Sequence, residues 1–217
     1  MTYAQKPQLT TPAGSALYPS LTSPDMGPND AWAGAGGKYN VKLLMDPEDC
    51  KEFVSEIDRL YEENYVAQCK KTGKKDLKKA NKPYSPHVDK DGNPSGMLQF
   101  NFAMKAKGTT KTGEQFERKP KFFGPDGGTI PFDQVPVLGN GSTLKISHFV
   151  DGWHTSMAGA GVSLRIRGVQ ILNVIERDSG GNAEDHGFSC EGEALATAPA
   201  PTVEAIDAAI EESDHEF

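Results

Sequence analysis

Apolar side chains recur every three or four positions between residues 50 and 65, which is the spacing of one face of a helix. The preceding residues, Asp46-Pro47-Glu48-Asp49, offer an N-cap, a proline for the first helical position and acids for the first turn. We therefore predict one helix that begins near Asp46 and ends between Cys69 and Gly73. The side chains that share its apolar face are Cys50, Phe53, Val54, Ile57, Leu60, Tyr61 and Tyr65.

Elsewhere apolar and polar side chains alternate, which is typical of half-buried strands. Four segments show this pattern, namely residues 39–45, 97–107, 143–150 and 162–167. We also predict strands at residues 116–123 and at the apolar run 169–175. Asn140-Gly141 is a dipeptide typical of a two-residue hairpin turn. His148 falls on the apolar face of its strand, so we predict that it is a core residue. One helix inserted after the first of five or six strands predicts a mainly β chain that forms a small antiparallel barrel.

The two ends of the chain differ from this central part in composition. Residues 1–30 contain five prolines, which interrupt helices and most strand ladders, so we predict an extended, flexible N-terminal arm. After Arg177 the sequence becomes rich in Gly, Ala, Pro and acids. The predicted organisation is an extended N-terminal arm (1–30), one β domain (31–177) and a disordered acidic tail (178–217).

The formal net charge of −7 is the sum of two unlike parts. Residues 178–217 contain 11 acids and no Lys or Arg, whereas residues 1–177 contain all 23 basic residues and 19 acids, a net charge of +4. A basic body with an acidic tail is typical of proteins that associate with nucleic acid. The alternative is a tail that serves only solubility.

Several classes of protein are excluded by what the sequence lacks. No apolar run approaches 18 residues, so no membrane partner is expected. The N-terminus lacks the pattern of a secretory signal, and three widely spaced cysteines predict neither a disulfide framework nor a zinc site. Five unclustered histidines and the absence of a nucleophile signature predict no metal, no cofactor and no enzymatic activity.

The remaining chemistry is a basic and aromatic surface. Phe149 lies on the polar face of its strand, and Trp153 with its neighbour His154 follows in a predicted loop, 151–160. Exposed aromatic rings among cations can stack on unpaired bases while the cations contact phosphates. For both rings the alternative is a packing role within the protein. The cations on the polar strand faces are Lys42, Lys105, Lys107, Lys145, Arg165 and Arg167.

A further group of seven lysines lies between residues 70 and 82. Gly73, Pro83 and Pro86 indicate that the helix does not continue through it. Two interpretations stay open, a solvated loop and a patch that attracts phosphates.

Five segments in the same order resemble the phage single-stranded DNA-binding proteins of the short-tailed coliphage type. They read AWAGAGGKYNVKLLM, CKEFVSEIDRLYEENY, KPY, FDQVPVLGNGSTLKI and GVSLRIRGVQILNVIE, from about Trp32 to Glu176. The resemblance implies an OB-fold with a helix inserted after the first strand and no enzymatic activity. It also implies an acidic tail that ends in an aromatic residue, competes with DNA and recruits replication proteins. The tail residues that match this ending are Glu211, Glu212, Asp214, Glu216 and Phe217.

Taken with this resemblance, the residues predict a sequence-tolerant single-stranded DNA-binding protein of phage DNA replication, recombination and repair. Trp32 and Tyr39 are added to the candidate stacking residues. The expected partners are single-stranded DNA and, through the tail, the phage DNA polymerase and helicase/primase, in the cytoplasm of the infected bacterial host. A homodimer stays open. The alternatives are a protein-interaction module, an RNA-binding OB protein and a nuclease.

Overall fold

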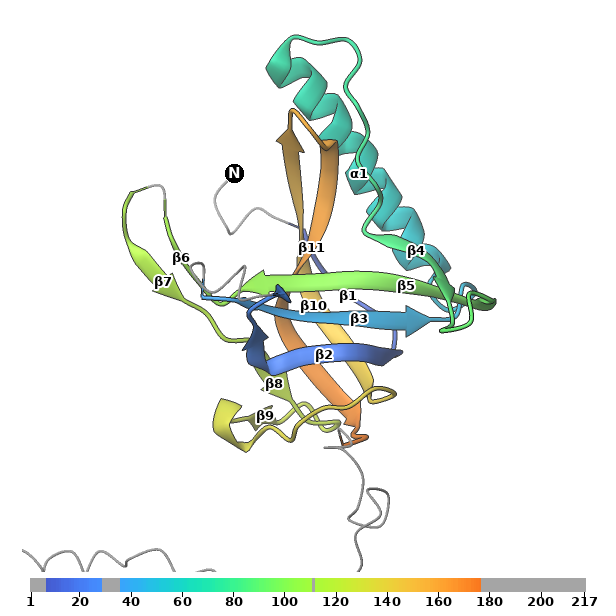
Figure 1. Ribbon diagram of the computed structural model, residues 1–217, viewed down its shortest axis with the longest axis vertical. Helices are drawn as coiled ribbons and strands as arrows, with labels where there is room; N and C mark the ends of the chain where they lie inside the picture. The colour runs from blue at the N-terminus through green and yellow to red at the C-terminus, as the bar shows by residue number, and fades with distance from the viewer. Residues whose placement is uncertain (1–6, 29–35, 111, 177–217) are drawn as a thin grey trace, which may run out of the picture. The chain divides into compact units, whose positions relative to one another are not determined.

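The computed structural model describes residues 7–28, 36–110 and 112–176 (Figure 1). This part of the chain is mainly β, with a single α-helix, α1 (Lys51–Thr72). The first strands are β1 (Gln8–Thr10), β2 (Gly14–Asp25), β3 (Lys38–Met45), β4 (Tyr84–Val88), β5 (Pro94–Lys105) and β6 (Lys107–Thr109). They are followed by β7 (Gln115–Glu117), β8 (Lys121–Phe123), β9 (Thr129–Ile130), β10 (Thr143–Thr155) and β11 (Gly159–Asn173).

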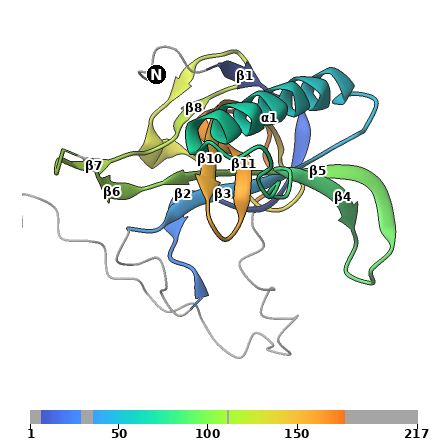
Figure 2. The same cartoon turned by 90° about the horizontal axis from the view of Figure 1, so that it is seen from above.

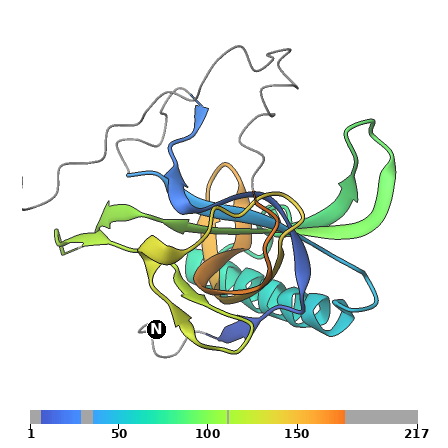
Figure 3. The same cartoon turned by 90° about the horizontal axis from the view of Figure 1, so that it is seen from below.

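Five of these strands close into a ring, in the order β2, β3, β5, β11, β10 and back to β2. Closure comes from a short pairing in which Thr143 on β10 lies opposite Ser15 on β2. The prediction of an all-antiparallel barrel is wrong, because β11 runs parallel to both β5 and β8. Figure 3 shows the β6–β7 hairpin and the β4–β5 hairpin projecting on opposite sides of the ring.

The core fills the inside of this ring. On β3 the alternation predicted from the sequence is confirmed, since Tyr39, Val41, Leu43 and Met45 are all buried. The facing positions on the other strands also bury large side chains, and burial of each such side chain contributes about 1.5–3 kcal/mol. The largest of these residues are Phe100, Phe102, Phe122, Leu144, Ile146, Leu164 and Ile166.

Helix α1 is confirmed and covers the β10–β11 hairpin, as seen from above in Figure 2. It ends as expected, because Gly73 adopts the left-handed conformation (φ 67°) that closes a helix C-terminus. Its start is later than predicted, at Lys51 with Cys50 as N-cap. The Asp46 carboxylate accepts the Glu48 N–H at 2.8 Å and so stabilises the turn before the helix instead. No helix of the described chain is long and apolar enough to cross a membrane.

The prediction of a flexible N-terminal arm is wrong for residues 8–25, which form β1 and β2 within the sheet. Ala16 and Leu21 of this segment are core residues. The prolines are accommodated where strand pairing is interrupted: Pro12 lies between the two strands, and Pro19 and Pro24 lie within the two register shifts of β2 against β3. The helix consequently follows the third strand rather than the first.

His148 is fully buried, as predicted. Its Nδ1–H donates to the Ile146 carbonyl at 3.2 Å, and the rings of Phe53 and Phe102 pack against it edge to face. Its Nε2 atom has no hydrogen-bond partner among the described residues. Burial lowers the pKa of His148 from 6.5 to about 4.

This histidine gives the fold a defined acid sensitivity. Between pH 6.5 and 4 the ring binds a proton in the unfolded chain but not in the folded chain, so stability falls as the pH falls through this window. We expect the free energy of unfolding to fall by about 3 kcal/mol more in the wild type than in His148→Gln between these limits. Urea unfolding at a series of pH values measures this difference. Equal slopes in the two proteins would contradict it.

Candidate nucleic-acid interface

An open groove of about 490 Å³ lies on the outer surface of the ring, lined by residues of β5, the β10–β11 hairpin and the ends of neighbouring strands. Four cationic side chains, one carboxylate and one indole line it together with smaller polar and apolar groups. These six residues are Lys38, Lys105, Arg118, Asp151, Trp153 and Arg165. In the described chain no cluster of three or more His, Cys, Asp or Glu side chains could hold a metal.

The cations reach the groove because strand side chains alternate between the two faces of a sheet. Tyr39 and Met104 point into the core, so their neighbours Lys38 and Lys105 point outward. These two lysines lie directly opposite each other on β3 and β5. Like charges in such cross-strand positions repel, and an anion bound between them would relieve this repulsion.

Trp153 was predicted to lie in a loop, but it belongs to β10, which pairs with β11 as far as Thr155. Its register partner is Gly161, where a Cβ atom would come within 2.9 Å of the indole Cζ2. Glycine at this position therefore lets one part of the indole lie directly on β11. The Asn64 side chain of α1 donates to the carbonyl oxygens of Trp153 (3.3 Å) and Gly161 (2.8 Å), which fixes both strands at this point.

Arg165 forms an ion pair with Asp151 across the same hairpin, with 2.9 Å between Nη2 and Oδ2. Both side chains are about one-fifth exposed, so the pair faces the groove from a partly desolvated position. An arginine in this setting can exchange its carboxylate partner for a phosphate.

Phe149 lies two residues before Asp151 on the same outer face of β10. The guanidinium carbons of Arg165 and Arg167 lie 5.8 and 5.2 Å from its ring centroid. Strand β1 pairs alongside, with Gln8 opposite Phe149, and the Gln8 side-chain carbonyl accepts from Arg167. Phe149 and Arg167 therefore form a cluster beside the groove rather than within its lining.

The prediction that Tyr39 stacks on a base is wrong, because the residue is buried. Its ring is 3% exposed and packs edge to face against Phe132, at 6.1 Å between centroids. The residue occupies the inward face of β3.

The other candidates lie at the margins. Lys42 points outward from β3 opposite Asn101, which also lines the groove. Lys107 pairs with Glu117 at 3.7 Å, and Lys145 lies opposite Gln170, outside the groove lining. His154 is half-buried beside Trp153. Trp32 and the tail residues, from Glu211 to Phe217, lie outside the described residues.

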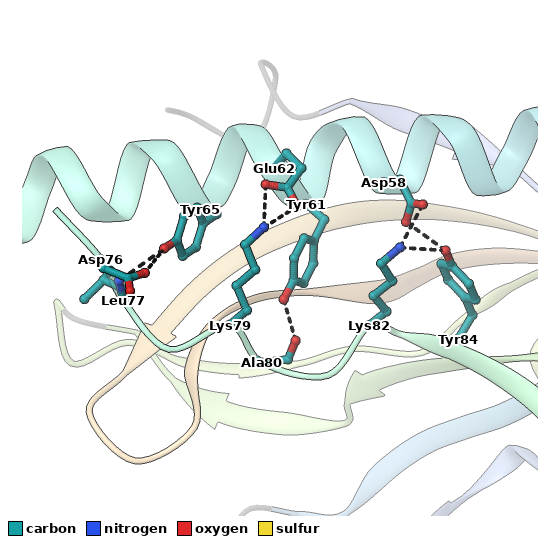
Figure 4. A network of polar contacts seen from close by, with 10 residues as sticks. All are labelled: Asp58, Tyr61, Glu62, Tyr65, Asp76, Leu77, Lys79, Ala80, Lys82 and Tyr84. Carbon is teal, nitrogen blue, oxygen red and sulfur yellow. Dashed lines mark hydrogen bonds and ion pairs between the residues drawn. The ribbon is translucent and has the colours of Figure 1, made fainter.

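Much of the lysine-rich segment is held against α1 (Figure 4). Lys79 binds both carboxylate oxygens of Glu62, while Lys82 binds Asp58 and the hydroxyl of Tyr84. The hydrogen bond to Asp58 raises the pKa of Lys82. The interpretation of the whole segment as a solvated loop is therefore wrong. The lysines that form no ion pair within the described chain are Lys70, Lys71, Lys74, Lys75 and Lys78, of which Lys78 donates to the Met157 carbonyl at 3.4 Å.

Sequence reasoning missed Lys38 and Arg118. Lys38 could have been found, since it extends the alternation of β3 by one residue outward. Arg118 follows a three-residue strand, and its guanidinium packs 3.9 Å from the Phe116 ring centroid. A strand this short gives no pattern from which that position could be predicted.

Comparison with known proteins shows which family has this sequence and fold. Residues 13–174 match the family model described as single-stranded DNA-binding protein, bacteriophage T7. No curated protein sequence matches the chain.

Several solved structures share the fold, among them two single-stranded DNA-binding proteins of phages. The crystal structure of gp2.5, a single-stranded DNA-binding protein encoded by bacteriophage T7, is 24% identical and has a TM-score of 0.65. The match covers 88% of this chain and all of gp2.5. The single-stranded DNA-binding protein of bacteriophage Enc34, in complex with single-stranded DNA, is 16% identical with a TM-score of 0.53, over 79% of this chain and 89% of that one. Because the family model spans most of the sequence, the chain belongs to the T7-type family of phage single-stranded DNA-binding proteins, whose role is binding and not catalysis.

Proposed function

We propose that this protein binds single-stranded DNA with little regard to sequence, in the groove between β5 and the β10–β11 hairpin. The observation that carries the proposal is the position of Trp153 beside Lys38, Lys105 and Arg165 on one outer face. We further propose that the five-stranded ring is an OB-fold. A closed five-stranded ring with the ligand groove on its outside supports this assignment.

In this mechanism the cations neutralise successive phosphates, and the exposed part of the indole stacks on a base. Stacking uses the π-face that every base has, so it tolerates any sequence. Duplex DNA hides these faces within its own stack. The groove should therefore prefer single strands.

We further propose that the protein acts in replication, recombination and repair of phage DNA in the cytoplasm of the infected host. Residues 178–217 support it through their charge of −11, which lets the tail compete with DNA for the basic groove. In this proposal the terminal residues from Glu211 to Phe217 recruit the phage DNA polymerase and helicase/primase.

A titration with single-stranded DNA, duplex DNA and RNA of equal length tests the proposal. Four groove cations give an expected log–log salt slope of about −3 for single strands, at about −0.7 per phosphate contact. Equal affinity for duplex DNA, or a flat response to salt, would overturn the proposed function. Tighter binding of RNA than of DNA would favour the RNA-binding alternative.

Asp151 offers a gain-of-affinity variant. We expect Asp151→Asn to tighten binding of oligo(dT) by about two- to fivefold, because Arg165 loses its ion-pair partner and turns to a phosphate. The salt slope should stay near that of the wild type, because Arg165 is already counted among the four phosphate contacts and the variant removes only its competing partner.

The matched control is Asp133→Asn, an exposed acid outside the groove lining. It makes the same change in net charge, so any effect of overall charge appears in both variants. Equal effects in the two variants would contradict a specific role for the Asp151–Arg165 pair.

A further inference from the structure

Tyr18 combines two features that rarely occur together. Its side chain is 61% exposed, and its backbone is left-handed, with φ at 49°, the one positive φ of a non-glycine residue in the described chain. Left-handed backbone favours glycine, and an aromatic residue there is under strain. Such strain persists only where the surrounding structure enforces it, and it concentrates at functional sites.

The strain arises from a β-bulge. Leu17 and Ser20 on β2 lie opposite Lys42 and Asn40 on β3, so β2 contains one extra residue in this interval. Bulges of this kind commonly place a left-handed residue in the extra position and turn its side chain away from its normal direction.

The neighbouring hairpin turn holds the bulge in place. The Tyr18 N–H donates to the Asn140 side-chain oxygen at 2.6 Å, and the Gly141 N–H donates to the Ala16 carbonyl at 2.8 Å. The backbone around Tyr18 is therefore fixed while its ring remains largely in solvent.

The surroundings of the ring suit a nucleotide. The Lys42 ammonium lies 6.0 Å from the ring centroid, within reach of a phosphate next to a stacked base. A pocket of about 130 Å³ adjoins the ring and is lined by Tyr18, Pro19, Ser20, Leu138, Gly139 and Asn140. Lys42 also lies opposite Asn101, which lines the groove that contains Trp153. Lys42 on β3 therefore lies between Tyr18 and a residue of the groove lining.

We propose that Tyr18 and Lys42 form a second base-stacking position, which binds the DNA strand where it leaves the main groove. This inference rests on the proposed function and extends it. On the outer face β3 lies between β2 and β5, and Asn101 of β5 lines the main groove, so two strand spacings, about 10 Å, separate β2 from this lining residue. Only an oligonucleotide long enough to span this distance reaches both positions.

The test compares Tyr18→Asn and Tyr18→Phe with the wild type, using oligo(dT) of about 2 and about 20 nucleotides, which lie below and above the usual site sizes. Asparagine tolerates the left-handed backbone but removes the ring, whereas phenylalanine keeps the ring. Val88→Asn is the matched control, because it removes another exposed apolar side chain, on β4. Fluorescence anisotropy gives each affinity, and thermal unfolding confirms that every variant is folded.

We expect Tyr18→Asn to weaken binding of the long oligonucleotide by about fivefold or more, with the short one unaffected. Tyr18→Phe and Val88→Asn should match the wild type with both. Wild-type affinity of Tyr18→Asn for the long strand, or an equal loss with both lengths, would overturn the inference. A wild type that binds neither oligonucleotide would instead overturn the proposed function.

Discussion

We expect Trp153→Ala to weaken binding of oligo(dT) by about 1–3 kcal/mol, which is roughly a 5- to 150-fold loss in affinity. The indole rests on Gly161 on one side and lines the groove on the other, so a base can stack on it without displacing the core. Quenching of tryptophan fluorescence by the oligonucleotide measures the same contact. Since the chain has two tryptophans, any quenching left in this variant comes from Trp32.

Two variants separate stacking from packing at this position. Trp153→Phe keeps an aromatic ring and should retain most of the affinity, whereas Trp32→Ala reports how much the second tryptophan contributes. Thermal unfolding must show that Trp153→Ala is folded, because the indole also covers Gly161. Unchanged affinity in the folded variant would show that Trp153 only anchors the hairpin.

The elements that the sequence predicted best are those with the strongest periodicity. Helix α1 and the alternating strands β3, β5 and β10 were found, because one face of each is buried and the other is not. Strand β11 was predicted as two strands, 162–167 and 169–175, although it runs without a break from Gly159 to Asn173. The spacing of apolar residues indicates which face of a single helix or strand is buried. It does not report which strands pair, so the parallel contact between β5 and β11 could not be read from it.

The N-terminal strands were missed because their prolines obscured the pattern. Pro19 and Pro24 lie in register shifts, where a residue without an N–H leaves no ladder hydrogen bond unmade. A single sequence does not show whether a proline lies in a free arm or at an interruption of a strand. Pairing with β3 and β10, which are distant in sequence, decides this.

The sequence predicted the kinds of residue in the candidate site better than it predicted where each residue lies. Lys105, Trp153 and Arg165 do come together in one groove, since outward positions on adjacent strands share a face. Tyr39 was chosen by residue type, although its own alternation with Lys38 placed it inside. Tyr18 was not considered at all, because nothing local distinguishes an exposed tyrosine at a bulge from one in an extended arm.

The second large effect expected is on the tail. Residues 178–217 carry −11 against +4 for the rest of the chain. If the tail competes with DNA as proposed, its covalent attachment would raise its effective concentration at the groove cations. We expect a chain that ends at Arg177 to bind oligo(dT) about tenfold more tightly than the full chain at about 0.01 M salt. The advantage should shrink at about 0.15 M, where the Debye length falls from about 30 to about 8 Å.

Deleting Phe217 alone separates this competition from recruitment of other proteins. It leaves all 11 tail acids in place, so DNA affinity should stay close to that of the full chain at every salt concentration. If the terminal ring is the contact for a replication protein, the same deletion should abolish that binding in a pull-down with the phage polymerase or helicase/primase. Competition by charge is contradicted if removal of residues 178–217 leaves affinity unchanged in low salt, because a tethered polyanion must then have no access to the groove.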